Sequence, residues 1–533
     1  MTSTLDDLRL DYEAARRGGR FMRARSGVPS QGANGDYHIR NERDLFFMVE
    51  LSRDMARNDI VLKPALRKTA TYVMRKGFKL VAQSPDEELN EDIQRRFAAW
   101  ASDSQKVDRD GEFDFNTMAH KVLYTSLLDG EMWPILYPEQ NIGLYETHRV
   151  RKPTGSRNDQ CVMGVEYEKG SRRRKRVWFT RDEIDPNRTV KLVGDMDRVD
   201  VFDANGLRVV LQVGDPERVS QTRCLPVITP VIRTLSQIDD TFFAKLLQQQ
   251  AVSIFAFIRT RDADSDAAYD NPEAAPGAQR EVSNEDGTTS VLEKWGPAMD
   301  YQAPPGETVQ AFSPKVPSAE FFPHMKLMLQ LVGAHFSLPL VLMLLDGSET
   351  NFSGWRGALD AAKAEFETIQ EWMVDRFHRP VALWWLHNER LSDPELDRRC
   401  RAAWDEDDEP RSFPHRWARP AWPYIEPKKD AEAEELKVSS LQTSPQLSAA
   451  GRGLTWDETI ISTVEAYESA VNRAKAAAKR INDAYPLDGD PVSWRDMLFL
   501  IRRAVGAPAP DPEQDEDTND AEPDRSPDRR EES

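Results

Sequence analysis

Apolar positions recur at helical spacing over most of the chain, and a strand-rich stretch lies between two helical parts. From residue 44 to residue 80, apolar side chains return every three or four positions, with a break near Asn58 and a glycine stop at Gly77. This pattern predicts two consecutive helices.

The stretch that follows combines helix and strand signals. Residues 114–137 predict a third helix that continues into a strand, and residues 161–179 predict a hairpin with a basic tip. Asn205 and Gly206 lie between two alternating apolar runs, which is the pattern of a two-residue hairpin turn. Residues 41–225 are therefore expected to form an α+β domain.

Long amphipathic helices dominate the second half. Residues 230–258 predict one helix, which becomes apolar on every side from residue 251. A second helix is expected from about Ser318 to Pro339. Its apolar seam has heptad-like spacing and consists of Phe322, Met325, Leu329, Val332 and Phe336. The polar residues 259–290 between the two helices predict an exposed projection.

A polar loop rich in Gly, Ser and Asn separates the second helix from a third. The loop begins at about Leu345, and the third helix begins at about Trp355. Pro380 is expected to kink this helix, because proline removes an internal hydrogen bond. After a Pro- and Trp-rich connector, helices are predicted at about residues 428–440, 455–483 and 491–505.

Composition is that of a soluble protein with several domains. The 533 residues are 30% charged and 39% hydrophobic, and a chain of this length exceeds one compact core. No apolar run reaches the length of a membrane-spanning helix. The three cysteines are Cys161, Cys224 and Cys400. They form no CxxC pair, and their odd number argues against a disulfide framework and favours a reducing cytoplasm.

The chain is acidic, with a formal net charge of −19. A low-complexity tail from Asp511 onward holds eleven Asp/Glu and three Arg, so it supplies −8 and leaves −11 for the rest. Such a tail is expected to be disordered. A protein that binds nucleic acid tightly is usually basic or has a strong basic face. The charge therefore argues against a high-affinity DNA-binding protein, although it is compatible with a surface along which DNA slides.

Two segments are basic despite this balance. Residues 1–40 are rich in Arg, Gly and Ser and are expected to form a flexible arm, with contact to a neighbouring subunit or to nucleic acid as the alternative. Residues 172–176, Arg-Arg-Arg-Lys-Arg, lie at the predicted hairpin tip. Such a run is usually a solvated turn, and a phosphate or partner contact is the other interpretation.

No motif for catalysis or cofactor binding is found. The sequence has no GxxxxGK[ST], HExxH or GxSxG motif, and its eight histidines have no zinc-ligand spacing with a cysteine. His120 and His335 lie on mostly apolar helices, which favours a structural role. Asp108–Asp114 faintly resembles a calcium loop but lacks its closing glutamate, which favours a turn. The sequence therefore predicts no enzyme, catalytic residue, metal or cofactor.

The order and spacing of five segments resemble the portal proteins of tailed bacteriophages and prophages, in particular the lambda-type branch. These segments are residues 52–80, 114–136, 227–258, 331–386 and 420–460. The most specific part is Gly333–Trp385. It is similar to the family's helix, Leu-Pro turn, polar D-x-S-x-T-N-[FY]-S loop and long helix ending in Arg-Pro.

This resemblance implies a mainly helical α+β portal fold that assembles as a dodecameric cyclic ring. The implied segments are a basic arm (1–40), a wing (41–225), stem helix 1 (226–258), a clip (259–318), stem helix 2 (319–337), a tunnel loop (338–356), a kinked wing helix (357–395), a crown (396–505) and a disordered acidic tail (506–533).

The implied tunnel loop would project into a central channel. Its residues are Asp346, Gly347, Ser348, Glu349, Thr350, Asn351, Phe352, Ser353 and Gly354. Repeated around a ring, the loop would form a flexible polar collar with Gly347 and Gly354 as hinges. Its carboxylates, Asp346 and Glu349, would repel phosphates, so that DNA slides instead of binding. The residues expected to pack the stem are Leu246, Phe255, Ile258, Phe322, Met325, Leu329 and Val332.

The resemblance also implies partners and a location. The expected partners are double-stranded DNA that passes without sequence specificity, the terminase large subunit, a head–tail adaptor, and a major capsid or scaffolding protein, with no membrane. The ring would sit at one capsid vertex of a virion after assembly in the host bacterial cytoplasm. One alternative is another head–tail connector or minor capsid protein. A remote alternative is a metal-dependent nuclease that uses the acidic run Asp405, Glu406, Asp407 and Asp408.

Overall fold

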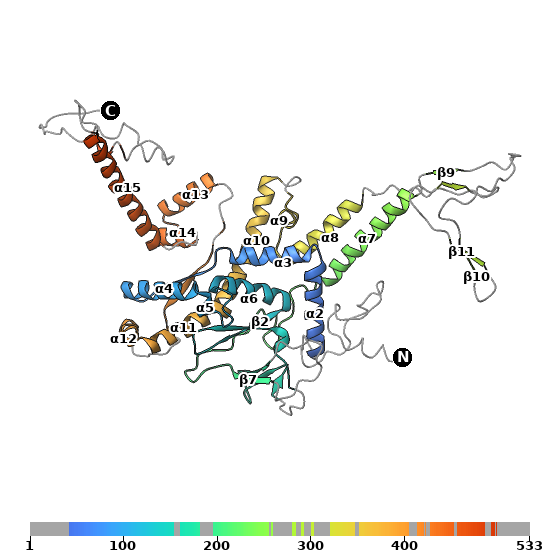
Figure 1. Ribbon diagram of the computed structural model, residues 1–533, viewed down its shortest axis with the longest axis horizontal. Coiled ribbons are helices and arrows are strands. Elements are labelled where there is room, and N and C mark those ends of the chain that lie inside the picture. Colours follow the sequence, from blue (N-terminus) through green and yellow to red (C-terminus); the bar gives the residue numbers. More distant parts are fainter. Residues whose placement is uncertain are drawn as a thin grey trace, which may run out of the picture. The chain divides into compact units, whose positions relative to one another are not determined.

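The chain forms two compact units, residues 1–421 and residues 422–533. The computed structural model describes residues 42–153, 160–181, 196–254, 257–259, 280–283, 289–292, 300–302, 320–346, 351–404, 413–420, 422, 427–451, 456–484, 492–495 and 497. Over these ranges the fold is α+β and mainly helical, as predicted (Figure 1). Among the described helices, none is long and apolar enough to cross a membrane.

The first unit begins with the two predicted helices, α2 (Glu42–Asn58) and α3 (Leu62–Met74). The carboxylate of Asp59 stabilises the start of α3 after the break, because its Oδ1 accepts hydrogen bonds from the backbone N–H groups of Val61 and Leu62. Gly77 follows α3 with a φ of 86°. The predicted break and the glycine stop are therefore both confirmed.

Local signals also define α6 (Phe115–Asp129). Asp114 is its N-cap, and its side chain accepts a hydrogen bond from Thr117 N. Gly130 ends the helix in the left-handed region, with a φ of 91°. A Cβ at Gly130 would lie 2.3 Å from the backbone carbon of Leu225, so only glycine fits here. The chain then enters β2 (Glu131–Leu136), which is buried throughout.

Two antiparallel sheets follow in the first unit. The first has the order β3–β2–β8 and the second β4–β5–β6–β7. Their remaining strands are β3 (Ile142–Glu146), β8 (Val213–Gly214), β4 (Cys161–Val162), β5 (Val165–Tyr167), β6 (Arg174–Thr180) and β7 (Met196–Asp200). One apolar cluster joins the sheets, and Trp133, Ile135, Val165, Val177 and Phe179 are among its members. The predicted hairpin over residues 161–179 is confirmed as β5 and β6.

The second predicted hairpin turn is longer than the sequence indicates. Asp203 and Gly206 close a four-residue turn, in which Gly206 N donates to Asp203 O at 3.1 Å. Gly206 has a φ of 76°, whereas Asn205 does not adopt positive φ. The Asp203 side chain determines this outcome, because its Oδ1 accepts hydrogen bonds from the backbone N–H groups of Asn205 and Leu207. The two-residue turn predicted from Asn205-Gly206 is therefore wrong.

A buried ion pair holds the loops around β2 together. Arg223 Nε donates to Glu131 Oε1, and both side chains are completely buried. The other guanidinium N–H groups donate to the carbonyl oxygens of Thr147, Val150 and Met163, each at 2.9 Å. The Glu131 carboxylate also accepts hydrogen bonds from Trp133 Nε1, Gln212 Nε2 and Cys224 N. Every charged atom of the pair is thus satisfied, which is what burial of charge requires.

The predicted irregularity at Pro380 is also present. α10 (Phe352–Met373) passes into a π-helical turn at Val374–His378, and α11 (Arg379–Ser392) continues from it with Pro380 in its first turn. Proline lacks the N–H that would complete a regular ladder, so the hydrogen bonds rearrange just before it.

An aromatic core surrounds this turn. Its rings belong to Phe78, Phe97, Trp100, Phe115, Phe377, His378, Trp385 and Trp417. They come from α4 (Glu87–Ala101), α6, the π-helical turn, α11 and β13 (His415–Ala418), and from Phe78, which precedes β1 (Lys79–Ala82). β1 pairs antiparallel with β13, so residues 413–420 belong to the first unit. The second unit begins at Trp422, so residues 396–421, which the resemblance assigned to the crown, belong to the first unit.

His378 makes the stability of this core dependent on pH. Its ring is fully buried against Phe78 and Trp417, and burial lowers its pKa from 6.5 to about 4. The unfolded chain therefore binds a proton between pH 6.5 and pH 4 that the folded chain rejects, so stability falls as pH falls through this window. The shift corresponds to a loss of about 3 kcal/mol in the free energy of unfolding.

Denaturant titrations of the parent and of His378→Phe at pH 7 and pH 4 measure this effect. Phenylalanine keeps the aromatic packing but does not titrate, so we expect the parent to lose about 3 kcal/mol more than the variant over this interval. Equal losses would show that His378 does not set the acid sensitivity.

The described secondary-structure elements of the second unit are helices. It contains α13 (Pro427–Ser439), α14 (Pro445–Gly451) and α15 (Trp456–Ala484). Two of these match the helices predicted at about 428–440 and 455–483. After α15 the chain turns back, because Asn482 exchanges two hydrogen bonds with the backbone of Val492.

Candidate functional site

The two long apolar helices of the second half form an antiparallel pair. α7 (Ile232–Ile254) and α8 (Phe321–His335) lie side by side (Figure 1). At the base of the pair, His335 Nε2 is 2.6 Å from Val227 O. Farther along, the ring of Phe242 meets the ring of Phe321 edge to face, with 6.0 Å between their centroids. The pair is therefore held at both ends of its contact.

The helix pair has both buried and exposed apolar side chains. Leu235 and Ile238 of α7 and Met325 and Val332 of α8 are buried. Large apolar side chains are exposed elsewhere on the pair, and these are Phe242, Phe243, Leu246, Leu247, Phe322, Leu327 and Leu331. We call this set the apolar stripe. Soluble monomers rarely expose a continuous apolar surface of this kind, so the stripe marks an interaction surface.

The predicted stem residues divide accordingly. Met325 and Val332 pack inside the chain, Leu329 is half-buried, and Leu246 and Phe322 are 55% and 63% exposed. Phe255 lies outside the described residues.

The helix predicted over residues 230–258 ends earlier than expected. α7 ends at Ile254, and Ile258 lies in β9 (Phe257–Arg259), which pairs in parallel with β12 (Asp300–Gln302). The prediction of a helix through Ile258 is therefore wrong. An Ile-Phe-Ala-Phe-Ile run has high strand propensity, and an apolar run is compatible with either structure. The expected projection contains a second strand pair, β10 (Arg280–Ser283) with β11 (Thr289–Leu292).

The residues that precede the polar loop are tightly packed and hydrogen-bonded. After α8 the chain turns so closely that a Cβ on Gly333 would lie 2.6 Å from Leu338 O. A short helix, α9 (Leu340–Leu344), follows, within the segment 338–356 that the resemblance assigned to the tunnel loop. Lys68 of α3 donates hydrogen bonds from Nζ to Leu342 O at 2.7 Å and to Met343 O at 3.0 Å. A cation at carbonyls of a last helical turn is favourable, and burial lowers the pKa of Lys68.

The loop itself is shorter than predicted. Leu345 adopts the left-handed region with a φ of 58°, and Leu345 and Asp346 are exposed. Residues 347–350, which are Gly347, Ser348, Glu349 and Thr350, lie outside the described residues. Asn351 is the N-cap of α10, and its Oδ1 accepts a hydrogen bond from Gly354 N at 2.7 Å.

Three residues assigned to the loop therefore belong to a helix. Phe352, Ser353 and Gly354 form the first turn of α10. The physical reason is the asparagine cap, which starts the helix before the predicted position at Trp355. Gly354 is thus a helical residue and not a loop hinge.

α10 is fixed to α3 on the far side of the loop. The rings of Tyr72 and Phe366 stack with 5.6 Å between centroids. The buried amide of Gln370 donates to Val73 O at 2.9 Å and to Pro420 O at 3.2 Å. α3 therefore contacts the short helix before the loop through Lys68, and the middle of α10, well beyond the end of the loop at Asn351, through Tyr72 and Val73.

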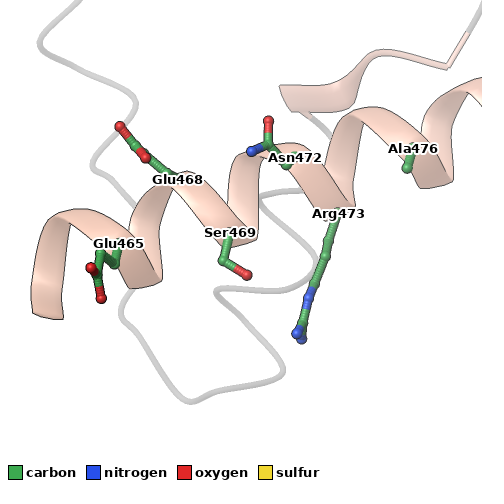
Figure 2. A pocket seen from close by; sticks show the side chains of 6 residues that line it. All are labelled: Glu465, Glu468, Ser469, Asn472, Arg473 and Ala476. Carbon is green, nitrogen blue, oxygen red and sulfur yellow. The ribbon is translucent and has the colours of Figure 1, made fainter.

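Two polar hollows elsewhere lack a convergent set of reactive groups. The first runs along α15 and is lined by Glu465, Glu468, Ser469, Asn472, Arg473 and Ala476. Figure 2 shows Glu468 and Asn472 pointing to one side of this helix and Arg473 to the other. The second lies between α4 and α12 (Pro394–Ala403), where Arg96 pairs with Asp92, Glu389 and Asp393. The charged side chains of this second hollow pair with one another and thereby join the helices.

Candidate metal ligands are structural where the chain is described. In that part of the chain, no group of three or more His, Cys, Asp or Glu side chains could hold a metal ion. The carboxylate of Asp108 accepts hydrogen bonds from the backbone N–H groups of Asp110, Glu112 and Phe113, so the segment 108–114 is a turn, as expected. The acidic run 405–408 lies outside the described residues. All three cysteines are buried, and none of them forms a disulfide.

The conspicuous basic run at residues 172–176 is held within its own sheet. Arg176 pairs with Asp200 at 2.6 Å, Arg173 approaches Glu168 at 3.8 Å, and Arg172 donates to Ser220 O. Arg172 and Arg173 end the turn and residues 174–176 begin β6, so the expected solvated turn is only partly correct. Sequence reasoning missed Lys68 and the cap at Asn351, although an asparagine directly before an apolar residue that begins a helical pattern is a recognisable start signal.

An α+β chain with an exposed apolar helix pair and a clamped polar loop has the features of an assembly protein. The sequence pattern of the phage portal proteins of the lambda family matches residues 22–370, and the chain belongs to this family. The resemblance seen in the sequence is thereby confirmed.

Two solved structures are similar to the chain at 12% identity. One is from the virion of a native gene transfer agent particle and has a TM-score of 0.38, covering 76% of this chain and 93% of that chain. The other is from the neck of an empty gene transfer agent particle and has a TM-score of 0.39, covering 79% of this chain and 96% of that chain. No curated protein matches the chain.

Proposed function

We propose that the chain is one subunit of a closed ring that serves as a non-enzymatic conduit for double-stranded DNA at one capsid vertex. Family membership supports a portal role. The observation that carries the ring is the apolar stripe, because α7 and α8 pair with each other and still expose seven large apolar side chains. In a cyclic assembly each stripe meets a surface of the next subunit, which removes it from water.

We assign different segments of the chain to different parts of the ring. In this proposal α7 and α8 are the stem, residues 259–318 are the clip, and the sheets with α2 to α6 are the wing. α10 and α11 rejoin the wing, and the second unit forms the crown.

We assign the loop between Leu345 and Asn351 to the wall of the channel. α3 holds the helix before the loop through Lys68 and the middle of α10 through Tyr72, so a short polar span joins two supported helices. Asp346 and Glu349 place carboxylates in this span, and like charge discourages phosphates from binding. A ring of such loops surrounds DNA without binding it tightly.

The partners in this proposal follow from the same role. DNA passes through the channel without sequence specificity, the terminase large subunit docks during packaging, and a head–tail adaptor docks later. The ring contacts the major capsid or scaffolding protein, assembles in the bacterial cytoplasm and resides in the virion. A purified particle with a mass near twelve times 60.8 kDa and a central bore supports the proposal. A particle of defined mass without a bore would favour another head–tail connector or a minor capsid protein.

Removal of residues 347–350 tests the loop. This deletion spares the cap Asn351 and the anchor Lys68, so we expect normal ring assembly with impaired DNA packaging or retention. Particle mass and the amount of nuclease-protected DNA per capsid measure the two effects. A matched variant, in which Gly-Ser-Glu-Thr is replaced by Gly-Ser-Gln-Thr at the same length, separates loss of length from loss of charge. Full packaging by the shortened ring would remove the proposed role of the loop.

A further inference from the structure

The helix that anchors the loop carries an uninterrupted set of positive charges. Between Asp59 and Asp86 the chain has six Lys/Arg and no carboxylate residue, in a protein with a net charge of −19. Such a local excess of cations opposes the overall charge of the chain. It therefore calls for a structural explanation.

Two of these cations, Lys63 and Arg67, are exposed and lie four residues apart on one face of α3. Arg75 is exposed at the residue that follows the helix. Lys121 is exposed on the neighbouring helix α6, which packs against α3. Burial and the nearby charges of Lys121 and Arg67 lower the pKa of His120, in agreement with the packing of α6 against α3. We call Lys63, Arg67, Arg75 and Lys121 the basic stripe.

The basic stripe has no counter-charge in the part of the chain that the structure describes. No ion pair joins any of its four side chains to a carboxylate there, in contrast to residues 172–176. The nearest acidic residue along α3, Asp59, uses its side chain to cap the helix. The exposed side chains between the cations include Thr71 and Thr117, whose hydroxyl groups donate hydrogen bonds to anions.

We propose that the basic stripe is a binding surface for the phosphate backbone of double-stranded DNA. Residues four apart on a helix rise by about 6 Å, which is close to the axial distance of about 7 Å between alternate phosphates of one strand. Within α3 and α6 no large apolar side chain is exposed, so the surface lacks the apolar centre of a protein interface. The contact to DNA is electrostatic and independent of sequence.

This inference deepens the proposed function. Lys68, the anchor of the acidic loop, lies next to Arg67 on α3, so one helix carries an attractive surface and supports a repulsive one. DNA would be held weakly by the basic stripe and kept sliding at the loop. The chain's acidic tail is the other polyanion that the stripe could bind, and the experiment distinguishes the two.

Binding of a fluorescent 30-base-pair duplex of mixed sequence to the full chain, measured by anisotropy between 50 and 200 mM KCl, tests the proposal. The test variant is Lys63→Gln/Arg67→Gln/Lys121→Gln. The control is Arg95→Gln/Arg398→Gln/Lys428→Gln, which removes the same charge from side chains that are 78%, 79% and 90% exposed. Each lost phosphate contact lowers the slope of log affinity against log salt by about 0.9.

We expect the test variant to lose about 3 units of slope and at least tenfold in affinity at 100 mM salt, and the control to stay within twofold of the parent. No binding by the parent, or equal slopes for test and control variants, overturns the inference. Tighter binding of a synthetic peptide of residues 506–533 than of the duplex, lost in the test variant, assigns the stripe to the tail and also overturns it. Particle mass is measured in parallel, so a missing ring, which contradicts the proposed function, is distinguished from unchanged DNA binding.

Discussion

Replacement of Phe243 and Leu246 by glutamate is expected to abolish ring assembly while the subunit stays folded. Both side chains belong to the apolar stripe and are 55% exposed in the single chain, so they contribute little to its own core. At a subunit interface, burial of each such side chain contributes about 1.5–3 kcal/mol, and a buried carboxylate without a partner costs several more. Since a cyclic ring repeats the interface at every subunit, the loss affects all contacts at once.

Mass photometry of the purified double variant measures this outcome directly. We expect a particle of one subunit in place of a ring, with the thermal midpoint of the subunit unchanged. The matched control is Val219→Glu/Leu391→Glu, because these side chains are also exposed and lie outside the apolar stripe. Rings of normal mass in the Phe243→Glu/Leu246→Glu variant would show that the stripe does not join subunits.

Removal of the positive charge from the buried Glu131–Arg223 pair is expected to have the largest effect on stability. In Arg223→Met the Glu131 carboxylate stays buried without its counter-charge, and the carbonyl oxygens of Thr147 and Val150 lose their donor. Breaking a buried ion pair in this way costs about 3–5 kcal/mol in the free energy of unfolding. The loops around β2 would loosen first, because the pair joins them.

The double variant Glu131→Gln/Arg223→Met provides the control. It removes both charges, so we expect it to recover part of the stability that the single variant loses. Denaturant unfolding followed by tryptophan fluorescence reports on this region, since Trp133 lies beside the pair and donates to Glu131. A loss below about 1 kcal/mol in Arg223→Met would mean that water or a neighbouring group replaces the arginine.

The elements that the sequence predicts well are those with strong local signals. Asp114 and Gly130 define both ends of α6, and Pro380 marks the π-helical turn, because each acts through its own backbone or side chain. The end of α7 at Ile254 is not predicted, since an apolar run such as Ile254–Ile258 fits a helix or a strand until its partner β12 is known. The pairing of β1 with β13 is a long-range contact and leaves no local trace.

The candidate site also combines features that the local sequence predicts with features that depend on long-range contacts. The polar loop and its flanking helices are evident from composition, whereas its clamps depend on a lysine and a tyrosine almost 300 positions away along the chain. Charge is the hardest property to judge. Residues 172–176 are the most basic run in the sequence but are paired in the fold, whereas the cations of α3 are spread along a helix and remain without carboxylate partners in the described part of the chain.

Electron microscopy of the purified full chain tests the central claim most directly. The account predicts end-on views of a closed ring, and a reconstruction in which α7 and α8 pack between adjacent subunits and residues 345–351 border the bore. A stable single subunit, or a ring whose 345–351 segment faces outward, would contradict it.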